Sequence, residues 1–333
     1  MNRPTPPSKS VRITIAVALG AVAISCAAPR RAQDTEQRSI RSHDLVVQAE
    51  GSLETGDTEE ALRLLSDAIE SNPTLAIAHL KIADIHRVKG DFTKAERSYA
   101  AAASLEPRSF DAQYYHGLTL HFLNRLAESV RAYLRALAIQ PDDFNANLNI
   151  ATAYFQLSEP RQAIAYAERA IRLAPASGPA HANLGAVYAA LGRHEEAVRQ
   201  YEAAAELMDL TPALLLNLAE SLGKTGRYEE MEITLDAVRE MERSAVAWER
   251  TGYARFKRRN YVGAVEAFQS AIDADARHYP ALNGLGVCLL NRYLLSDRTD
   301  HAARRQALAF LRRSLRINNR QSQIVDLVSR FGG

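Results

Sequence analysis

The sequence predicts an all-α protein built from repeated pairs of helices. Of its 333 residues only 16 are glycine and 12 are proline, which disfavours a loop-rich β protein. Hydrophobic residues make up 47% and charged residues 24%, as in an ordinary soluble protein. In addition, one pattern of large and small residues returns about every 34 residues, a period typical of helix–turn–helix solenoids.

The clearest copy of this pattern begins at Gly178. It has large residues at its positions 7, 11 and 24 and small residues at positions 8, 20 and 27, namely Leu184, Tyr188, Tyr201, Gly185, Ala197 and Ala204. Small residues let two helices approach closely, while the large ones fill the space between pairs. Glycine near position 15 suits the turn, and proline near position 32 cannot continue a helix and therefore ends the unit.

About eight such units are predicted over residues 42–319. They start near Ser42, Ala76, Phe110, Phe144, Gly178, Pro212, Ala245 and Tyr279. The last unit is interrupted by an insertion at about 294–305. Because no single unit can bury its apolar face alone, we expect the amphipathic residues 320–333 to form a capping helix over the last one.

These signature positions resemble the tetratricopeptide repeat family over most of the chain. The resemblance implies a right-handed α-solenoid in which the first helix of each unit lines a concave groove. It also implies that the groove binds another protein or a peptide and that the solenoid itself is not an enzyme.

Three asparagines recur at position 6 of successive units: Asn149, Asn183 and Asn217. They resemble the asparagine ladder with which some family members hold an extended peptide. An amide side chain offers both a donor and an acceptor, which is what a peptide unit requires. The alternative is that these residues merely suit an exposed helix or bond to a neighbouring helix.

Further groove candidates lie on both sides of the asparagines. Tyr114 and Tyr115 belong to an aromatic stretch of the third unit that could receive an apolar anchor, or could instead pack on the neighbouring first helix. Lys81 in the second unit, and Arg250 and Tyr253 in the seventh, complete the predicted partner-binding residues.

Arginines gather near the C-terminus: Arg298, Arg304, Arg305, Arg312, Arg313, Arg316 and Arg320. In the repeat frame, most of them fall on the outer side of a second helix. They could form a solvated convex face, or they could contact anionic lipid or an acidic partner.

The N-terminus reads as a targeting segment, residues 1–25, rather than as part of the fold. Arg3, Lys9 and Arg12 precede an apolar run of secretory length that is too short to span a bilayer comfortably. The run ends in Ala23-Ile24-Ser25-Cys26, which resembles the lipobox of bacterial lipoproteins.

The lipobox resemblance implies cleavage before Cys26 and acylation of that residue, followed by a polar linker over 26–41. Since no aspartate follows Cys26, it also favours the periplasmic side of the outer membrane as the location. The alternatives are an ordinary signal peptide, giving a secreted or periplasmic product, and an uncleaved signal anchor.

No motif for catalysis is present: we find no phosphate loop, nucleophile elbow, dinucleotide-binding glycine pattern or zincin sequence. With two cysteines and nine scattered histidines, we predict no catalytic residue, no metal site and no cofactor. The formal charge of +2 gives no reason to expect nucleic acid, and no small-molecule substrate is predicted. The sequence therefore predicts a non-catalytic adaptor of the cell envelope, or alternatively a substrate-recruiting or regulatory module for an enzyme on another chain.

Overall fold

The computed structural model describes residues 27–332, which contain 17 helices and no strand. The expected signal peptide, residues 1–25, and the lipidation residue Cys26 lie outside this range. The chain divides into two compact units, the first ending at Ala78 and the second beginning at His79.

In the first compact unit, α1 (Ala27–Glu54) packs against α2 (Thr58–Ser71). The segment expected to be a polar linker, 26–41, is helical from Ala27 onward and continues without a break into the first repeat. Alanine, glutamine, glutamate and arginine dominate this segment, and all four are good helix formers that can extend an already packed helix.

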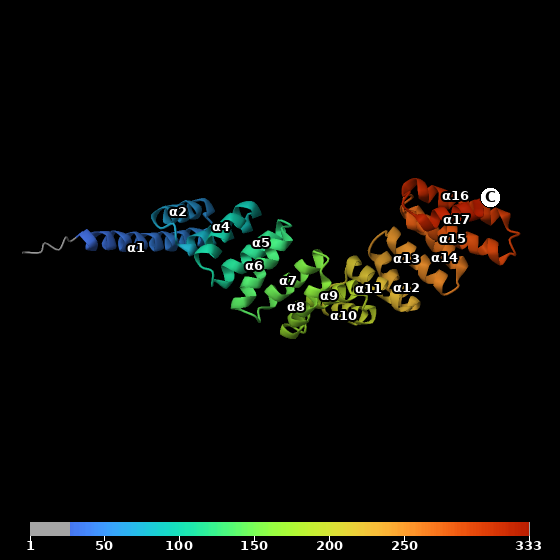
Figure 1. Ribbon diagram of the computed structural model, residues 1–333, viewed down its shortest axis with the longest axis horizontal. Coiled ribbons are helices and arrows are strands. Elements are labelled where there is room, and N and C mark those ends of the chain that lie inside the picture. The colour runs from blue at the N-terminus through green and yellow to red at the C-terminus, as the bar shows by residue number, and fades with distance from the viewer. Residues whose placement is uncertain (1–26, 333) are drawn as a thin grey trace, which may run out of the picture. The chain divides into compact units, whose positions relative to one another are not determined.

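The second compact unit contains most of the helix pairs (Figure 1). In each pair the first helix begins at the residue that the repeat frame assigns to position 1. The bounds are α3 (Ala76–Val88), α4 (Phe92–Leu105), α5 (Phe110–Phe122), α6 (Leu126–Ile139), α7 (Phe144–Gln156), α8 (Pro160–Leu173), α9 (Gly178–Ala190), α10 (His194–Leu207), α11 (Pro212–Thr225), α12 (Tyr228–Met241), α13 (Ala245–Lys257) and α14 (Tyr261–Ala274).

Side-chain caps fix the starts of the first helices. The side chains of Ser109, Asp143, Ser177, Thr211 and Ser244 each accept a hydrogen bond from a backbone N–H in the first turn of the helix that follows. Such a cap satisfies one of the donors that a helix start leaves unpaired, and is typically worth about 1 kcal/mol.

In the first seven pairs, a residue with positive φ at position 15 makes the turn. Four of these residues are glycines, which adopt this left-handed conformation without steric cost: Gly56, Gly90, Gly192 and Gly226. In the third, fourth and seventh units the same conformation is adopted by Asn124, Ser158 and Arg259.

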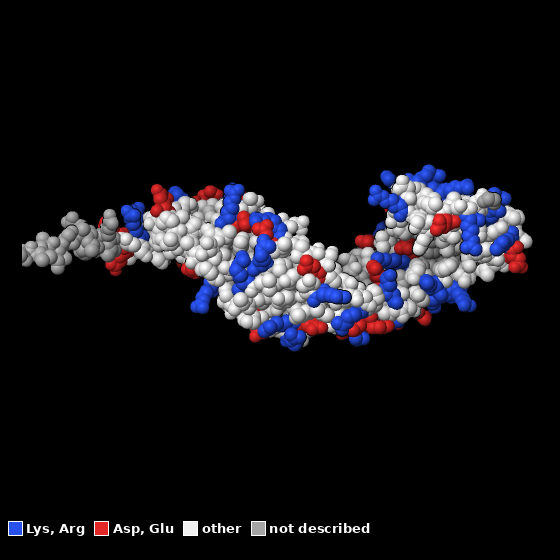
Figure 2. Space-filling model, viewed as in Figure 1, with Lys and Arg blue, Asp and Glu red and all other residues white. Residues whose placement is uncertain are grey.

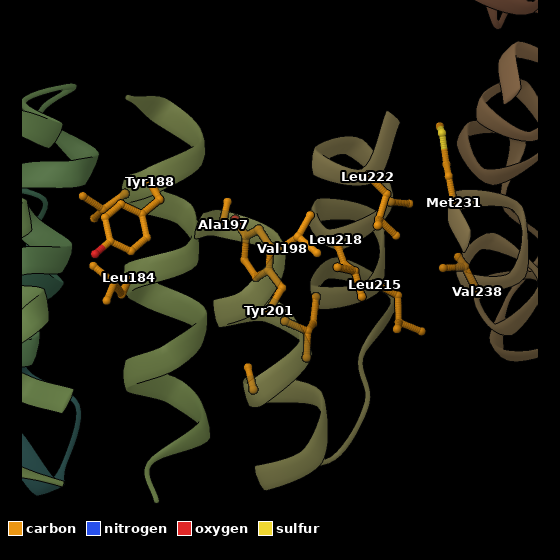
Figure 3. Close-up of a cluster of buried hydrophobic side chains, with 14 of the residues drawn as sticks. Leu184, Tyr188, Ala197, Val198, Tyr201, Leu215, Leu218, Leu222, Met231 and Val238 are labelled. Atoms are coloured by element: carbon orange, nitrogen blue, oxygen red, sulfur yellow. The ribbon is translucent and has the colours of Figure 1, made fainter. Parts of the chain in front are cut away.

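Close approach of the helices explains the small residues of the repeat. A Cβ atom on Gly185 would lie 2.8 Å from the Tyr201 ring, so only glycine leaves room for that ring. Tyr201, Leu184 and Leu218 belong to one buried cluster that runs through successive pairs (Figure 3). From the fourth to the seventh unit the core is thus continuous from pair to pair rather than closed within each unit.

The sixth unit departs from the pattern and compensates for it. Met231 stands at position 20, where most of the other units have alanine and the third has serine, yet it is only 3% exposed. Gly223 faces it: a Cβ there would lie 2.9 Å from the Met231 sulfur. The larger side chain is therefore accommodated by a glycine on the partner helix.

The last pair consists of α15 (Tyr279–Leu295) and α16 (His301–Ile317), each 17 residues long, whereas the preceding first helix α13 has 13 residues and the preceding second helix α14 has 14. The insertion expected at about 294–305 thus lengthens both helices in addition to joining them. α17 (Ser322–Gly332) then packs against α16, and its Leu327 and Phe331 contact the last apolar cluster.

Candidate partner-binding groove

The first helices of neighbouring pairs lie against one another, with α5 contacting α7, α7 contacting α9 and α9 contacting α11. Position 6 contributes one side chain from each of them. From the second to the seventh repeat these residues are Lys81, Tyr115, Asn149, Asn183, Asn217 and Arg250. Several predicted groove residues therefore belong to a single row. Their hydrogen bonds and exposure show which of them are engaged within the protein.

Two of the three asparagines bond to the preceding first helix. The Nδ2 atom of Asn149 donates to the Tyr114 hydroxyl at 3.0 Å, and that of Asn183 donates to Thr152 Oγ1 at 2.8 Å. Both side chains thereby connect neighbouring first helices, as the alternative interpretation of the sequence allowed. Their use by a partner stays a prediction.

Asn217 is different. Its side chain is exposed and makes no hydrogen bond to any residue that the structure describes. The repeat frame gives the reason, because the preceding unit has Ala182 and Ala186 at the positions where earlier units provide Tyr114 and Thr152. The donor and the acceptor of Asn217 both face solvent.

Arg250 continues the row on α13. One of its terminal nitrogens donates to the carbonyl oxygen of Leu216 at 2.6 Å, and the other donates to the carboxylate of Glu220 at 2.9 Å. Arg250 is thus held in place by the preceding first helix. Nearby, Tyr253 is 40% exposed, and the Lys257 ammonium lies 5.4 Å from the centre of its ring.

A cavity of about 200 Å³ opens beside these residues. Its lining includes Glu249, which stands at position 5 of the seventh unit and was not among the candidates from the sequence. Burial raises the pKa of Glu249, and the nearby Arg250 only partly opposes this effect. Within the described chain no donor bonds to its carboxylate. Position 5 is a groove position, so the repeat frame could have pointed to this residue.

The lining of this cavity comes from three consecutive helices. α11 contributes Glu220, Gly223 and Lys224, α12 contributes Met231, and α13 contributes Glu249, Arg250 and Tyr253. Acidic, basic and aromatic groups thus meet at one opening, which suits a polar segment of a partner better than a purely apolar one.

The tyrosines of the third unit are mostly engaged within the protein. Tyr114 stacks on Phe110 with ring centres 5.6 Å apart, and Tyr115 stacks on Tyr99 at 5.8 Å. Burial raises the pKa of Tyr114 to about 12. The better exposed aromatic residue here is Phe122, which is 61% exposed. Lys81 is half-buried on α3.

Groups that could support other chemistry are sparse. The part of the chain that the structure describes holds no cluster of three or more metal-binding side chains. It also holds no helix with both the length and the apolar character needed to cross a bilayer. Cys288 is 2% exposed, and burial raises the pKa of its thiol to about 12. A thiol in that environment packs as a small apolar group rather than reacting as a thiolate.

The same repeat is found by comparison with known families. A family model described as tetratricopeptide repeat matches residues 47–103, 80–144, 148–214, 216–278 and 250–297. The chain belongs to the tetratricopeptide repeat family. The matched segments cover both the asparagine row and the cavity beside Glu249, so these features lie within tetratricopeptide repeats rather than in an added domain.

Solved structures agree with this fold. A tetratricopeptide repeat protein from Parabacteroides merdae is 16% identical, with a TM-score of 0.51 over 75% of this chain and 99% of that one. The pilF protein of Pseudomonas aeruginosa is 19% identical, with a TM-score of 0.50 over 62% of this chain and 93% of that one. At such identities the likeness concerns the fold alone.

A similarity to a curated protein covers a smaller part of the chain. Superkiller complex protein 3 of Mus musculus is 33% identical over 79 residues. This stretch is 24% of the present chain and only 5% of that protein. The match therefore concerns a few repeats and carries no information about the activity of the whole relative.

Proposed function

We propose that this protein is a non-catalytic adaptor whose groove of first helices binds an extended segment of a partner protein. We further propose that a lipid on Cys26 holds it at the cell envelope. Membership of the tetratricopeptide repeat family supports a protein or peptide partner. The lipobox-like sequence before Cys26 is the basis for the anchor.

The observation that carries the groove proposal is the exposed amide of Asn217. It stands in the same row as Asn183, which is already bonded to Thr152, and as Arg250, which is bonded to Leu216 and Glu220. It is followed by the cavity that Glu249 and Tyr253 line. A peptide unit needs one donor and one acceptor, and Asn217 offers both without losing a bond inside the protein.

Distances in the fold suit an extended ligand. Packed helices lie about 10 Å apart, while an extended chain advances about 3.3 Å per residue. A peptide that bonds to Asn217 would therefore reach the neighbouring first helix, α13, within about three residues. Tyr253 and the cavity beside it are then available to one of its side chains.

Site-specific photocrosslinking tests the groove. We would place benzoylphenylalanine at Tyr253 in the full-length protein and irradiate intact cells. The matched control carries the same group at Ile233, which is 65% exposed on α12, a second helix. We expect a discrete crosslinked partner from Tyr253 only, and a yield that drops severalfold when Asn217→Ala is added.

Equal adducts from the two positions, or an adduct that does not respond to Asn217→Ala, would contradict the groove proposal. Mass spectrometry of the adduct also separates the two forms of the proposal. A structural envelope component supports an adaptor, whereas an enzyme supports a recruiting or regulatory module for another chain.

The anchor has its own test. Cells fed labelled palmitate are expected to incorporate it into the wild-type protein, and Cys26→Ala should abolish incorporation. Label that persists in Cys26→Ala would show that Cys26 is not the acylated residue.

A further inference from the structure

Charge is distributed very unevenly along the chain. From Arg277 to the C-terminus the sequence has ten arginines but only three aspartates, with no lysine and no glutamate. The whole protein has a formal charge of only +2, so the remaining residues are net acidic. Figure 2 shows basic side chains gathered over the C-terminal helices.

The centre of this basic region is α16. It contains five arginines and no acidic residue. Two of the five are used inside the protein: Arg304 Nε donates to the carbonyl oxygen of Phe331 at 2.8 Å, and Arg313 donates to that of Ala276 at 2.6 Å. They tie α16 to its neighbours.

The other three arginines have no such role. Arg305, Arg312 and Arg316 are exposed, and none forms an ion pair or a side-chain hydrogen bond within the part of the chain that the structure describes. With 100° per residue, these three positions fall within about 40° of one another around the helix axis. They form a single stripe, about 16 Å long at 1.5 Å per residue.

The exposed residue next to the stripe is small. Ala309 is exposed between Arg305 and Arg312, so no bulky side chain keeps the helix away from a flat surface. Two cavities of the second compact unit are lined by other helices: one of about 450 Å³ lies between α14 and α15, and another opens beside Glu249. The stripe is thus a convex row of cations without a groove.

We propose that the arginine stripe of α16, formed by Arg305, Arg312 and Arg316, docks the solenoid on a bilayer that contains anionic phospholipid. Guanidinium groups form paired hydrogen bonds with phosphate oxygens. Headgroups in a fluid bilayer can rearrange beneath each arginine, which a convex row requires. A protein ligand, in contrast, gains affinity mainly from anchors buried in pockets. The proposal rests on α16 alone and does not require either the lipid on Cys26 or the peptide groove.

The test is a fluorescent probe within the stripe. In the full-length protein, Cys26→Ser leaves the buried Cys288 as the native thiol. Ala309→Cys is then labelled with a dye that headgroup-linked quenchers can reach. Vesicles of phosphatidylcholine with 30% phosphatidylglycerol, a composition we choose as the probe, are compared with pure phosphatidylcholine. We expect quenching of the dye by the anionic vesicles and its loss at high salt.

A triple variant removes the charges without touching the core. Arg305→Gln, Arg312→Gln and Arg316→Gln are expected to lower quenching and vesicle affinity by roughly a hundredfold, because each surface arginine contributes about a factor of five. The matched control removes three exposed arginines from other second helices, Arg131→Gln, Arg161→Gln and Arg199→Gln, and should lower affinity much less. A label at Ala190→Cys, exposed on α9, reports whether docking is local to α16.

Each outcome decides for or against the proposal. Quenching at Ala309 that is specific to anionic vesicles and lost in the stripe variant supports it. Equal losses in the two triple variants show a general charge effect and overturn it. Binding of polyglutamate without binding to vesicles would assign the stripe to an acidic protein and overturn the proposal. An equal change in dye fluorescence with inorganic phosphate, at the phosphate concentration of the vesicles, would show simple anion binding and also overturn it. Quenching that the stripe variant retains would reflect insertion of the N-terminal segment.

Discussion

Two stretches of the groove use the same repeat position in opposite ways. On α7 and α9, Asn149 and Asn183 each donate to the preceding first helix. On α11, Asn217 is exposed and makes no side-chain hydrogen bond to the described residues. Asparagine at position 6 therefore connects neighbouring helices on α7 and α9, whereas on α11 its amide has no hydrogen-bond partner among the described residues.

The difference arises from the neighbour rather than from the asparagine. Tyr114 and Thr152 offer hydroxyl groups to the two engaged amides, whereas the unit before Asn217 offers only Ala182 and Ala186. A row of identical side chains in a solenoid is thus not in itself a binding ladder. Each position has to be judged together with the unit that precedes it.

The largest expected difference in stability between the α9 and α11 stretches concerns glycines at close helix contacts. Gly185→Ala would place a Cβ 2.8 Å from the Tyr201 ring, which is held rigidly in the core. Overpacking of this kind typically costs about 1–3 kcal/mol. Both changes gain roughly 1 kcal/mol in helix propensity. In Gly223→Ala this gain should offset the contact, because the new Cβ meets only the flexible end of Met231, whereas in Gly185→Ala it offsets only part of the overpacking. Thermal unfolding followed by circular dichroism should show a lower Tm for Gly185→Ala only; equal Tm values would contradict this packing.

A smaller effect tests the asparagines themselves. Asn183→Ala removes the hydrogen bond to Thr152 and is expected to destabilise the fold by about 1 kcal/mol. Asn217→Ala removes no internal bond, so its stability should stay within about 0.5 kcal/mol of wild type.

A double-mutant cycle of Asn183→Ala with Thr152→Ala, measured by urea unfolding, isolates the bond between the two side chains. Purely additive losses would show that Asn183 is not a connection between helices, and the contrast with Asn217 would disappear.

The smallest effect concerns Glu249. Its pKa is raised in the folded protein by burial, so the folded state binds the proton more tightly than the unfolded chain does. This contribution to stability is present at low pH and is lost as the pH rises from the ordinary glutamate value through the raised one. The Tm of Glu249→Gln relative to that of the wild type should therefore increase as the pH is raised from 4 to 7. Glu220→Gln, at an exposed residue on the same cavity, serves as the control. A constant difference across this range would contradict the raised pKa.

Much of the fold can be predicted from the sequence because the spacing of the repeat determines where each helix begins. The residue assigned to position 1, such as Gly178 or Ala245, is where a first helix begins, since caps and turns recur at fixed offsets. The all-helical fold and the helix after the last pair are confirmed. Composition did not indicate that the segment 26–41 is helical from Ala27, since a polar segment next to a packed helix can remain helical. Its role as a linker stays a prediction.

The sequence alone could not separate the roles of the groove residues. Whether Asn183 or Asn217 is engaged depends on a residue about one repeat away, and therefore on which helices come into contact. Glu249 belongs to no sequence motif, because its importance comes from burial beside a cavity. The signal that could have found it is its groove position combined with an acidic residue in a half-buried site.

The turns at position 15 have a consequence for motion. Ser158 and Arg259 adopt a left-handed conformation that costs residues other than glycine about 1–2 kcal/mol, whereas Gly192 and Gly226 adopt it freely. Solenoids are stabilised unit by unit and by contacts between neighbours, so such strain stays local and lowers the free energy of local opening. The seventh unit, which carries Arg250 and Tyr253, is one of the strained ones. We therefore expect the seventh unit to open locally more readily than the fifth and sixth units, whose turns are Gly192 and Gly226. Such opening would let this part of the groove adjust its shape to an arriving chain.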